Sequence, residues 1–383
     1  MEENKSFKMN RVGQYYLNLD FKFVLVLFMI ASAFVNLLFY GQSHLLNQIM
    51  LILEMGFLTL AIIVSRLKIA LRDLTLGIIA IVLGFINAII NKSGYGTIIA
   101  YYIFICFSII SKYFSISKKH RKFMIGIVAL CLWIIIGLYS RQHYSWYYCV
   151  IPKWSQYNYN ANVMAILIFA AGIYSISYLD YFRRGVINLL VKFEVIGVCL
   201  YLLYRTGART SFVLFVFYVI FGVLMRMRYN KKNIKHIVIF LTVAGLLITL
   251  VYIYMYRYLS DFYIFGKNLY TGRQKIWMEA WELIRGNLIF GYSNKHLYCN
   301  YFVNAHNSYI ALLGNLGLVP FLLFGYFMAR VFSDKYILDH RMVTAFFMFM
   351  VVAMFETLYT EIDLMFMIFL LPYLAKKELK IDT

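Results

Sequence analysis

The chain has 383 residues, of which 63% are hydrophobic and 14% are charged, and its formal net charge is +20. Soluble proteins are nearer half apolar and a quarter charged, so this composition excludes an ordinary soluble domain. Strong positive charge is also typical of nucleic-acid-binding proteins, but here the distribution of the basic residues follows membrane topology and excludes that class.

Apolar runs of about 20 residues, the length that crosses a bilayer, recur along almost the whole chain. We predict twelve membrane-spanning helices, at residues 21–40, 45–65, 74–90, 97–114, 123–139, 162–179, 186–204, 208–225, 237–256, 308–329, 342–359 and 361–375. The first 20 residues are polar, so we expect the first span to act as an uncleaved anchor. The predicted fold class is all-α, a polytopic integral membrane protein in which residues 1–383 form one domain.

Basic residues orient these spans. If both termini are cytoplasmic, the inner segments hold 26 of the 37 Lys and Arg residues. This is the positive-inside asymmetry, and inverting the chain would break it at nearly every pair of loops. We therefore expect a multi-pass protein with both termini in the cytoplasm, and residues 257–305 as one long outer loop.

Arginines are expected to be scarce on the outer side, yet Arg205, Arg209, Arg257, Arg273 and Arg285 all lie there. A guanidinium group binds phosphate oxygens bidentately, and the natural anionic substrate at this face is a lipid-linked diphosphate. The alternative partners are lipid headgroups or nearby acidic side chains, and we favour that alternative for Arg257 and Arg285.

A short amphipathic helix is predicted inside the outer loop. Thr271 followed by Gln274 is a capping-box pattern, apolar residues then recur at helical spacing, and Gly286 is suited to end the helix. We expect this helix to lie on the outer membrane face with Trp277 and Trp281 at headgroup level.

The amino terminus of this helix is a candidate phosphate site. Its free N–H groups and positive dipole end attract anions, Gly272 lets an anion approach the backbone, and Arg273 stands beside it. A capping box alone often matches by chance, so the residues leave a purely structural helix start open as well.

His306 begins the return of the chain into the membrane. Histidine is the usual general base near neutral pH, and a hydroxyl acceptor requires one. The alternative is a histidine that caps or orients the next helix, and the residue by itself favours that alternative.

Glu54 and Glu194 are acidic residues inside predicted spans, where an ionisable side chain is costly and calls for a role. Glu54 either lines a substrate cavity or pairs with another polar group, and we favour pairing. Glu194 lies in the seventh span with Lys192 nearby.

Several short motifs follow one another in the second half of the chain. They are Asn160-Ala161-Asn162, Thr206-Gly207-Ala208-Arg209-Thr210, Thr271-Gly272-Arg273 with Trp277, Gly286 to Gly291, and His306-Asn307. Their order and spacing resemble the bacterial O-antigen ligase and Wzy-type polysaccharide polymerase superfamily over residues 158–330. The chain departs from the family pattern at Ala208 (usually Ser), at Ala161 (usually Pro), and after Gly291, where a second Gly is common.

The resemblance implies glycosyl transfer from an undecaprenyl-diphosphate donor at the outer face, without a metal or another cofactor. Two arginines hold the diphosphate and a histidine activates the acceptor; carried over by motif, these catalytic residues are Arg209, Arg273 and His306. The expected substrate-binding residues are Arg205, Thr271, Gly272, Trp277 and Asn307. The implied partners are undecaprenyl-diphosphate-linked oligosaccharide and polysaccharide, the lipid bilayer, and flippase and chain-length regulator proteins; no nucleic acid is expected.

The predicted function is therefore that of a capsular or O-antigen polysaccharide polymerase of the bacterial cytoplasmic membrane. It would transfer the growing glycan from undecaprenyl diphosphate to a lipid-linked repeat unit. An O-antigen ligase shares these motifs and is the alternative. A polysaccharide flippase, from another class of protein, should instead show repeated halves and charge at the middle of the membrane.

Overall fold

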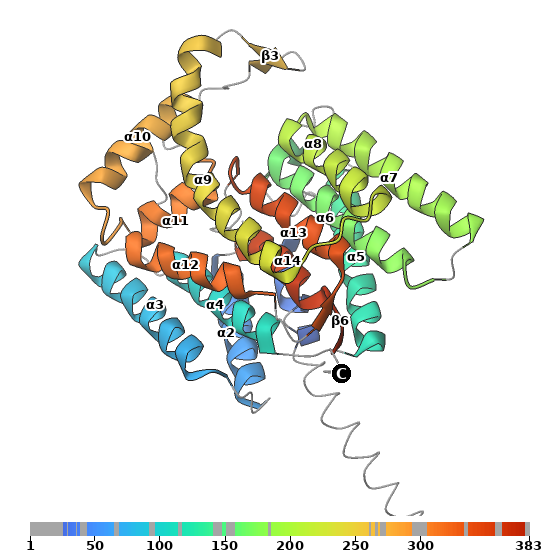
Figure 1. Cartoon of the computed structure of the whole chain (residues 1–383), viewed down its shortest axis with the longest axis horizontal. Helices are drawn as coiled ribbons and strands as arrows, with labels where there is room; N and C mark the ends of the chain where they lie inside the picture. The colour runs from blue at the N-terminus through green and yellow to red at the C-terminus, as the bar shows by residue number, and fades with distance from the viewer. Residues whose placement is uncertain are drawn as a thin grey trace, which may run out of the picture.

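α-Helices make up nearly all of the regular structure in the computed structural model of this chain (Figure 1). The structure describes residues 26–28, 30–35, 37–38, 44–64, 69–91, 96–113, 117–140, 148–150, 158–182, 185–259, 262–264, 267–268, 273–292, 305–332, 336–356 and 362–379. The described part is all-α apart from short strand pairs, as the composition predicts.

Along the chain the helices are α2 (His44–Val64), α3 (Leu71–Ile90), α4 (Gly96–Tyr113), α5 (Lys118–Ser140), α6 (Ala161–Leu179), α7 (Val186–Thr206), α8 (Arg209–Phe217), the π-helix η1 (Tyr218–Leu224), α9 (Lys231–Leu259), α10 (Arg273–Gly286), α11 (Ser308–Leu316), α12 (Leu318–Arg330), α13 (His340–Val352) and α14 (Ile362–Leu374). The strands pair antiparallel, β1 (Tyr148–Val150) with β2 (Asn158–Asn160), β3 (Tyr263–Ile264) with β4 (Lys267–Asn268), and β5 (Tyr336–Leu338) with β6 (Lys376–Leu379).

Five helices in the described part are long and apolar enough to cross a membrane: Leu71–Ile90, Lys118–Leu138, Ala161–Leu179, Val186–Thr206 and Lys232–Tyr256. Large apolar side chains on these helices point away from the protein; Ile187 of α7 is 79% exposed and Phe240 of α9 is 68% exposed. Such side chains would be costly in water but are suited to contact with lipid. The fold is thus that of a helical membrane protein.

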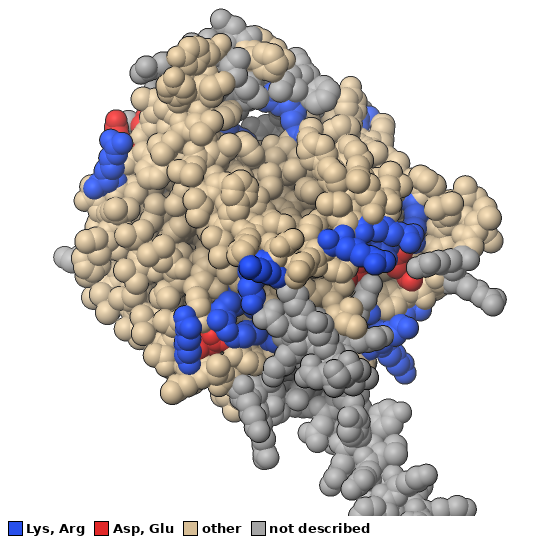
Figure 2. Space-filling view, in the orientation of Figure 1, with Lys and Arg blue, Asp and Glu red and all other residues tan. Residues whose placement is uncertain are grey.

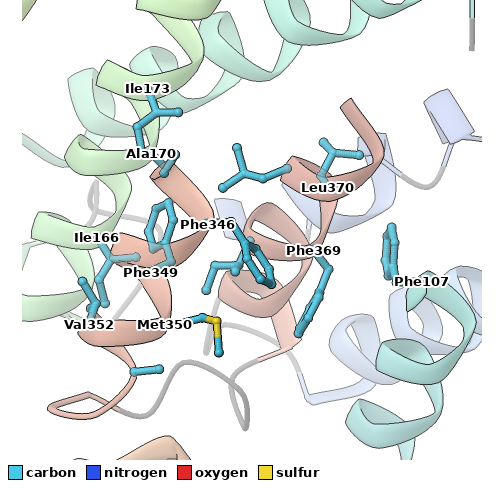
Figure 3. Close-up of a cluster of buried hydrophobic side chains, with 14 of the residues drawn as sticks. Phe107, Ile166, Ala170, Ile173, Phe346, Phe349, Met350, Val352, Phe369 and Leu370 are labelled. Carbon is cyan, nitrogen blue, oxygen red and sulfur yellow. The ribbon is translucent and has the colours of Figure 1, made fainter. Parts of the chain in front are cut away.

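The core lies where α6, α13 and α14 meet beside α4 (Figure 3). Figure 3 shows side chains from all four helices pointing toward one another, among them Phe107, Ile166, Phe349 and Phe369. Phe349 of α13 packs against Phe169 of α6 with ring centroids 4.8 Å apart. Because α6 is apolar all round, it can be buried on nearly every side, and most of its residues are buried.

The predicted span 308–329 is divided into α11 and α12 at Gly317. Gly317 has φ +83°, and a Cβ there would lie 2.1 Å from the carbonyl oxygen of Ile289, so a larger residue does not fit. The turn after α10 docks at this point, because Leu318 N–H donates to Leu288 O at 2.9 Å. All nine residues of α11 are buried, so this short helix is surrounded by protein.

Charged side chains gather on the side of the molecule where the chain ends, and α10 and β3 lie at the opposite side (Figures 1 and 2). On the first of these sides Asp73 bonds to Lys112, and Asp180 bonds to Lys192 and Arg341. Lys192, which lies near Glu194 in the sequence, therefore pairs with Asp180.

Glu54, an acidic residue predicted within a span, is buried in α2. Its Oε1 atom lies 3.5 Å from the hydroxyl oxygen of Ser32. This contact favours the structural pairing that the sequence suggested over a role in lining a substrate cavity.

Candidate active site

Glu356, an acidic residue just beyond α13, joins two of the predicted site residues. Arg273 Nη2 donates to Glu356 Oε1 at 2.8 Å, and His306 Nδ1 lies 3.5 Å from Glu356 Oε2. The side chains of Arg273 and His306 are 18% and 26% exposed, and that of Glu356 is 12% exposed. Three segments distant in sequence thus meet in a partly buried polar cluster that remains accessible.

Hydrogen bonds between the end of α13 and the start of α11 hold Glu356 in place. Ser308 N–H donates to Ala353 O at 2.8 Å, and Ser308 Oγ donates to Glu356 O at 2.6 Å. The Glu356 N–H completes the turn by donating to Val352 O at 3.0 Å. The predicted span 342–359 was therefore too long, because α13 ends at Val352 and the chain turns toward the site.

His306 has φ +47°, a left-handed conformation that is uncommon for a residue other than glycine. The residues on both sides of it are fixed. The indole Nε1 of Trp277 donates to Ala305 O at 2.6 Å, and Asn307 Oδ1 caps α11 by accepting from the N–H groups of Tyr309 and Ile310. Strained backbone of this kind persists only where surrounding contacts determine it, and it is enriched at functional sites.

Trp277 and Asn307 were predicted to bind substrate, and the structure shows what surrounds their side chains. Each is 0% exposed. Trp277 packs on Tyr252 of α9 with ring centroids 4.7 Å apart, and Asn307 Nδ2 donates to Gly245 O at 2.9 Å. Both side chains support the backbone around His306.

The side chain of Trp277, which was expected among lipid headgroups, is therefore enclosed by protein. Helical spacing identifies the apolar face of α10, but it does not show whether lipid or protein covers that face, and here α9 covers it. Trp281 shows the same arrangement, because its Nε1 donates to Thr249 Oγ1 on α9 at 2.8 Å.

Arg209, the first residue of α8, lies in the same neighbourhood as Arg273. Gly207 ends α7 with φ +66°, and α8 starts two residues later. The charge of Arg273 acts on Arg209, as does the side chain of Tyr252 on α9. Arg209 and Arg273, from different helices, are thus near enough for their charges to influence each other.

A pocket of about 380 Å³ lies at the junction of α7 and α8. Its lining combines two cations with apolar and aromatic side chains: Leu203, Tyr204, Arg205, Gly207, Ala208, Arg209 and Phe212. Arg205 Nη1 donates to Tyr201 Oη at 2.9 Å. Arg273 and His306 are not part of this lining, and Arg209 is the predicted catalytic residue that belongs to it.

The remaining predicted site residues, Thr271 and Gly272, lie outside the described residues. The helix that follows them starts at Arg273, which places this arginine in the first turn of α10. The phosphate site predicted at the start of α10 therefore stays a prediction.

Opposing effects set the protonation of Glu356. Burial raises the pKa of this carboxyl, but the charge of Arg273 and the nearby imidazole of His306 outweigh burial, so the pKa lies below its ordinary value. Glu356 is therefore an anion at neutral pH. In the part of the chain that the structure describes, no three His, Cys, Asp or Glu side chains are grouped to hold a metal ion.

Glu356 is the residue that sequence reasoning missed. The rule that singled out Glu54, an acidic residue inside an apolar run, applies equally to Glu356 in the predicted span 342–359. Its partners lie 83 and 50 positions earlier in the chain, so no local pattern could identify them.

Residues 195–325 match the family model described as O-Antigen ligase. The matched segment contains Arg205, Arg209, Arg273 and His306, and the match confirms the resemblance to the O-antigen ligase and Wzy-type superfamily. Enzymes of this family are glycosyltransferase-like and act on lipid-linked glycans in the membrane. No curated protein matches the chain, and no solved structure matches it either.

Proposed function

We propose that this protein is a polysaccharide polymerase that transfers a growing capsular or O-antigen glycan from undecaprenyl diphosphate to a lipid-linked repeat unit. The observation that supports the proposal is the cluster in which Glu356 joins Arg273 and His306, two residues of the region matching the family, with Arg209 near enough to be influenced by the charge of Arg273. Two cations beside one potential base are the groups that transfer from a diphosphate donor to a hydroxyl requires.

In this mechanism Arg209 and Arg273 bind the diphosphate of the donor. His306 takes the proton from the acceptor hydroxyl as the acceptor oxygen forms a bond to the anomeric carbon. The bond from that carbon to the phosphate oxygen breaks, and its electron pair leaves with the diphosphate. Charge develops on the leaving group during this step, so the two guanidinium groups stabilise the transition state more than the ground state. The proposed enzyme uses these arginines in place of a metal.

The proposed topology has twelve spans, cytoplasmic termini and an outer loop at residues 257–305, in a bacterial cytoplasmic membrane. Figure 2 supports this orientation, because the basic side chains that it shows gather mainly on the side opposite α10. α10 and the start of α11 then lie at the outer face, where a lipid-linked donor is presented. Residues 1–383 form one domain in this proposal, and a flippase and a chain-length regulator are its proposed partners.

A ligase is the second candidate, because the family model that matches the chain is described as O-Antigen ligase. Both activities use the same donor and differ in the acceptor, which is a lipid-linked repeat unit for a polymerase and another glycolipid for a ligase.

The lipid-linked glycans of a deletion strain separate these functions. Single repeat units on the outer face support the polymerase. Long chains retained on undecaprenyl diphosphate would identify a ligase, and repeat units confined to the inner face would identify a flippase and overturn the proposal. Complementation with the intact gene is the control in each case.

A further inference from the structure

Glu356 places a fixed negative charge inside a site that, under the proposed function, binds another negative charge. Its carboxylate holds Arg273 through one oxygen and faces His306 with the other. The charged and titratable side chains that act on it are Arg273 of α10 and His306, while Arg273 and Tyr252 in turn act on Arg209. A diphosphate that binds Arg273 must therefore compete with Glu356.

The two contacts of this carboxylate are unequal. The bond to Arg273 is 2.8 Å long, a full charge-assisted hydrogen bond. The 3.5 Å separation from His306 Nδ1 is long for a hydrogen bond, and the buried Nδ1 atom makes no well-formed hydrogen bond. In this arrangement Glu356 binds Arg273 firmly, but it does not yet orient the imidazole of His306.

We propose that Glu356 is a positioning residue whose carboxylate exchanges its bond to Arg273 for a hydrogen bond to His306 when the donor binds. The inference rests on the proposed function and deepens it. Donor phosphates replace Glu356 at Arg273, and the released carboxylate closes on His306 and accepts a hydrogen bond from Nδ1–H. This bond fixes the tautomer in which Nε2 is free to act as base.

This transfer couples donor binding to activation of the base. During the reaction Nε2 takes the proton of the acceptor hydroxyl, and the carboxylate of Glu356 stabilises the imidazolium without taking the proton itself. The diphosphate carries away the electron pair of the broken bond. Before the donor arrives, Glu356 neutralises Arg273 and leaves His306 weakly activated.

A structural role predicts a different outcome. If the Glu356 side chain only fastened α10 to the turn after α13, its loss would weaken donor binding and transfer together, because Arg273 would lose its support. The positioning role predicts instead that donor binding and transfer change in opposite directions. Removing the carboxylate frees Arg273 for phosphate but deprives His306 of its partner.

The experiment uses full-length protein in lipid nanodiscs, with undecaprenyl diphosphate as the binding probe and lipid-linked repeat units from the deletion strain as transfer substrate. We expect Glu356→Gln to bind undecaprenyl diphosphate about two- to fivefold more tightly, the scale of one ion pair. Its transfer rate should fall by about 10²-fold, within the range for a disabled base. The acid-side limb of its pH profile should move to lower pH, because no carboxylate stabilises the protonated imidazole.

Two further variants control the result. Glu282→Gln removes an exposed carboxylate from α10 and should leave binding, rate and pH profile unchanged. Glu356→Asp keeps the charge and should retain a pH profile close to that of the wild type, which tests the inference even if Glu356→Gln does not fold.

Parallel losses of binding and rate in Glu356→Gln, with an unchanged pH profile, would overturn the positioning role. A pH profile of Glu356→Asp that is displaced as expected for Gln would overturn it as well. Failure of the wild type to bind undecaprenyl diphosphate would instead overturn the proposed function, and the inference with it.

Discussion

The indole of Trp277 donates a 2.6 Å hydrogen bond to the carbonyl of Ala305, so α10 fixes the residue directly before His306. Both residues are fully buried. The first residue of α10 is Arg273, so one rigid helix positions the cation and also holds the backbone beside the proposed base. A substitution in α10 can therefore alter the positions of both Arg273 and His306.

Trp277→Phe should lower both stability and activity. The change leaves the buried carbonyl of Ala305 without its donor, which costs about 1–3 kcal/mol. The strained backbone of His306 then loses one of its supports, so the transfer rate should also fall. Thermal unfolding in detergent and a transfer assay measure the two effects. Trp281→Phe is the matched control, since it removes the indole bond to Thr249 Oγ1 and should lower stability but not the rate.

Arg273→Lys should lose most of the polymer while the protein still inserts at the normal level. Lysine keeps the charge and can pair with Glu356, but its ammonium group cannot reproduce the bidentate geometry of a guanidinium on phosphate. Gel analysis of the glycan beside an immunoblot of the membrane fraction tests this. Arg285→Lys, at an exposed position of the same helix, should behave as wild type. Full-length polymer from the Arg273 variant would reduce this residue to a headgroup contact.

Arg209→Ala and His306→Ala should fail in different ways. Loss of Arg209 removes a cation from the donor site, so binding of undecaprenyl diphosphate should weaken together with transfer. Loss of His306 should keep donor binding but slow transfer by ~10²–10⁴-fold, the usual effect of removing a general base. Direct binding measurements and single-turnover rates in nanodiscs distinguish the two. Near-normal turnover in His306→Ala would leave this histidine as a structural residue only.

The stability of the folded protein should depend on pH through the carboxyl group of Glu356. Its pKa in the folded protein lies below the ordinary value of 4.5, so its stabilising effect is fully present above that pH and is lost as the pH falls through the folded pKa. The unfolding temperature of Glu356→Gln should lie below that of the wild type at neutral pH, and the difference should shrink on acidification below about pH 4.5. If the difference in unfolding temperature grew as the pH fell, the ion pair between Glu356 and Arg273 would not be its cause.

The orientation of the outer loop can be tested by labelling in intact cells. In a background with the five native cysteines replaced by serine, Lys267→Cys should react with a membrane-impermeant thiol reagent. Lys231→Cys should react only after the cells are permeabilised. Reaction at position 231 in intact cells would reverse the topology and remove the site from the outer face.

Local features of the fold could be predicted from the sequence, whereas the partners of each element could not. A helix is predicted between Thr271 and Gly286, and α10 runs from Arg273 to Gly286. Spacing and end signals depend on a few neighbouring residues, so they are visible in one short segment. The burial of Trp277 depends on α9, which no pattern within α10 specifies.

The same limit applies to the site. Arg273 and His306 could be proposed from their positions and motifs, but Glu356 lies 83 residues beyond Arg273 and contacts it only after folding. Hydropathy also averages over breaks, so it predicted one span at 308–329 where Gly317, with its positive φ, divides two helices.

The division at Gly317 has a consequence for how the bilayer acts on the enzyme. The nine residues of α11 span only ~13.5 Å, less than half of a hydrocarbon core of about 30 Å. Because every residue of α11 is buried, this helix has no lipid-facing surface of its own and cannot respond to hydrophobic mismatch by tilting. The long exposed helices such as α7 and α9 accommodate changes in membrane thickness. His306 lies just before the buried helix α11, so a change in thickness affects this residue only through the surrounding protein.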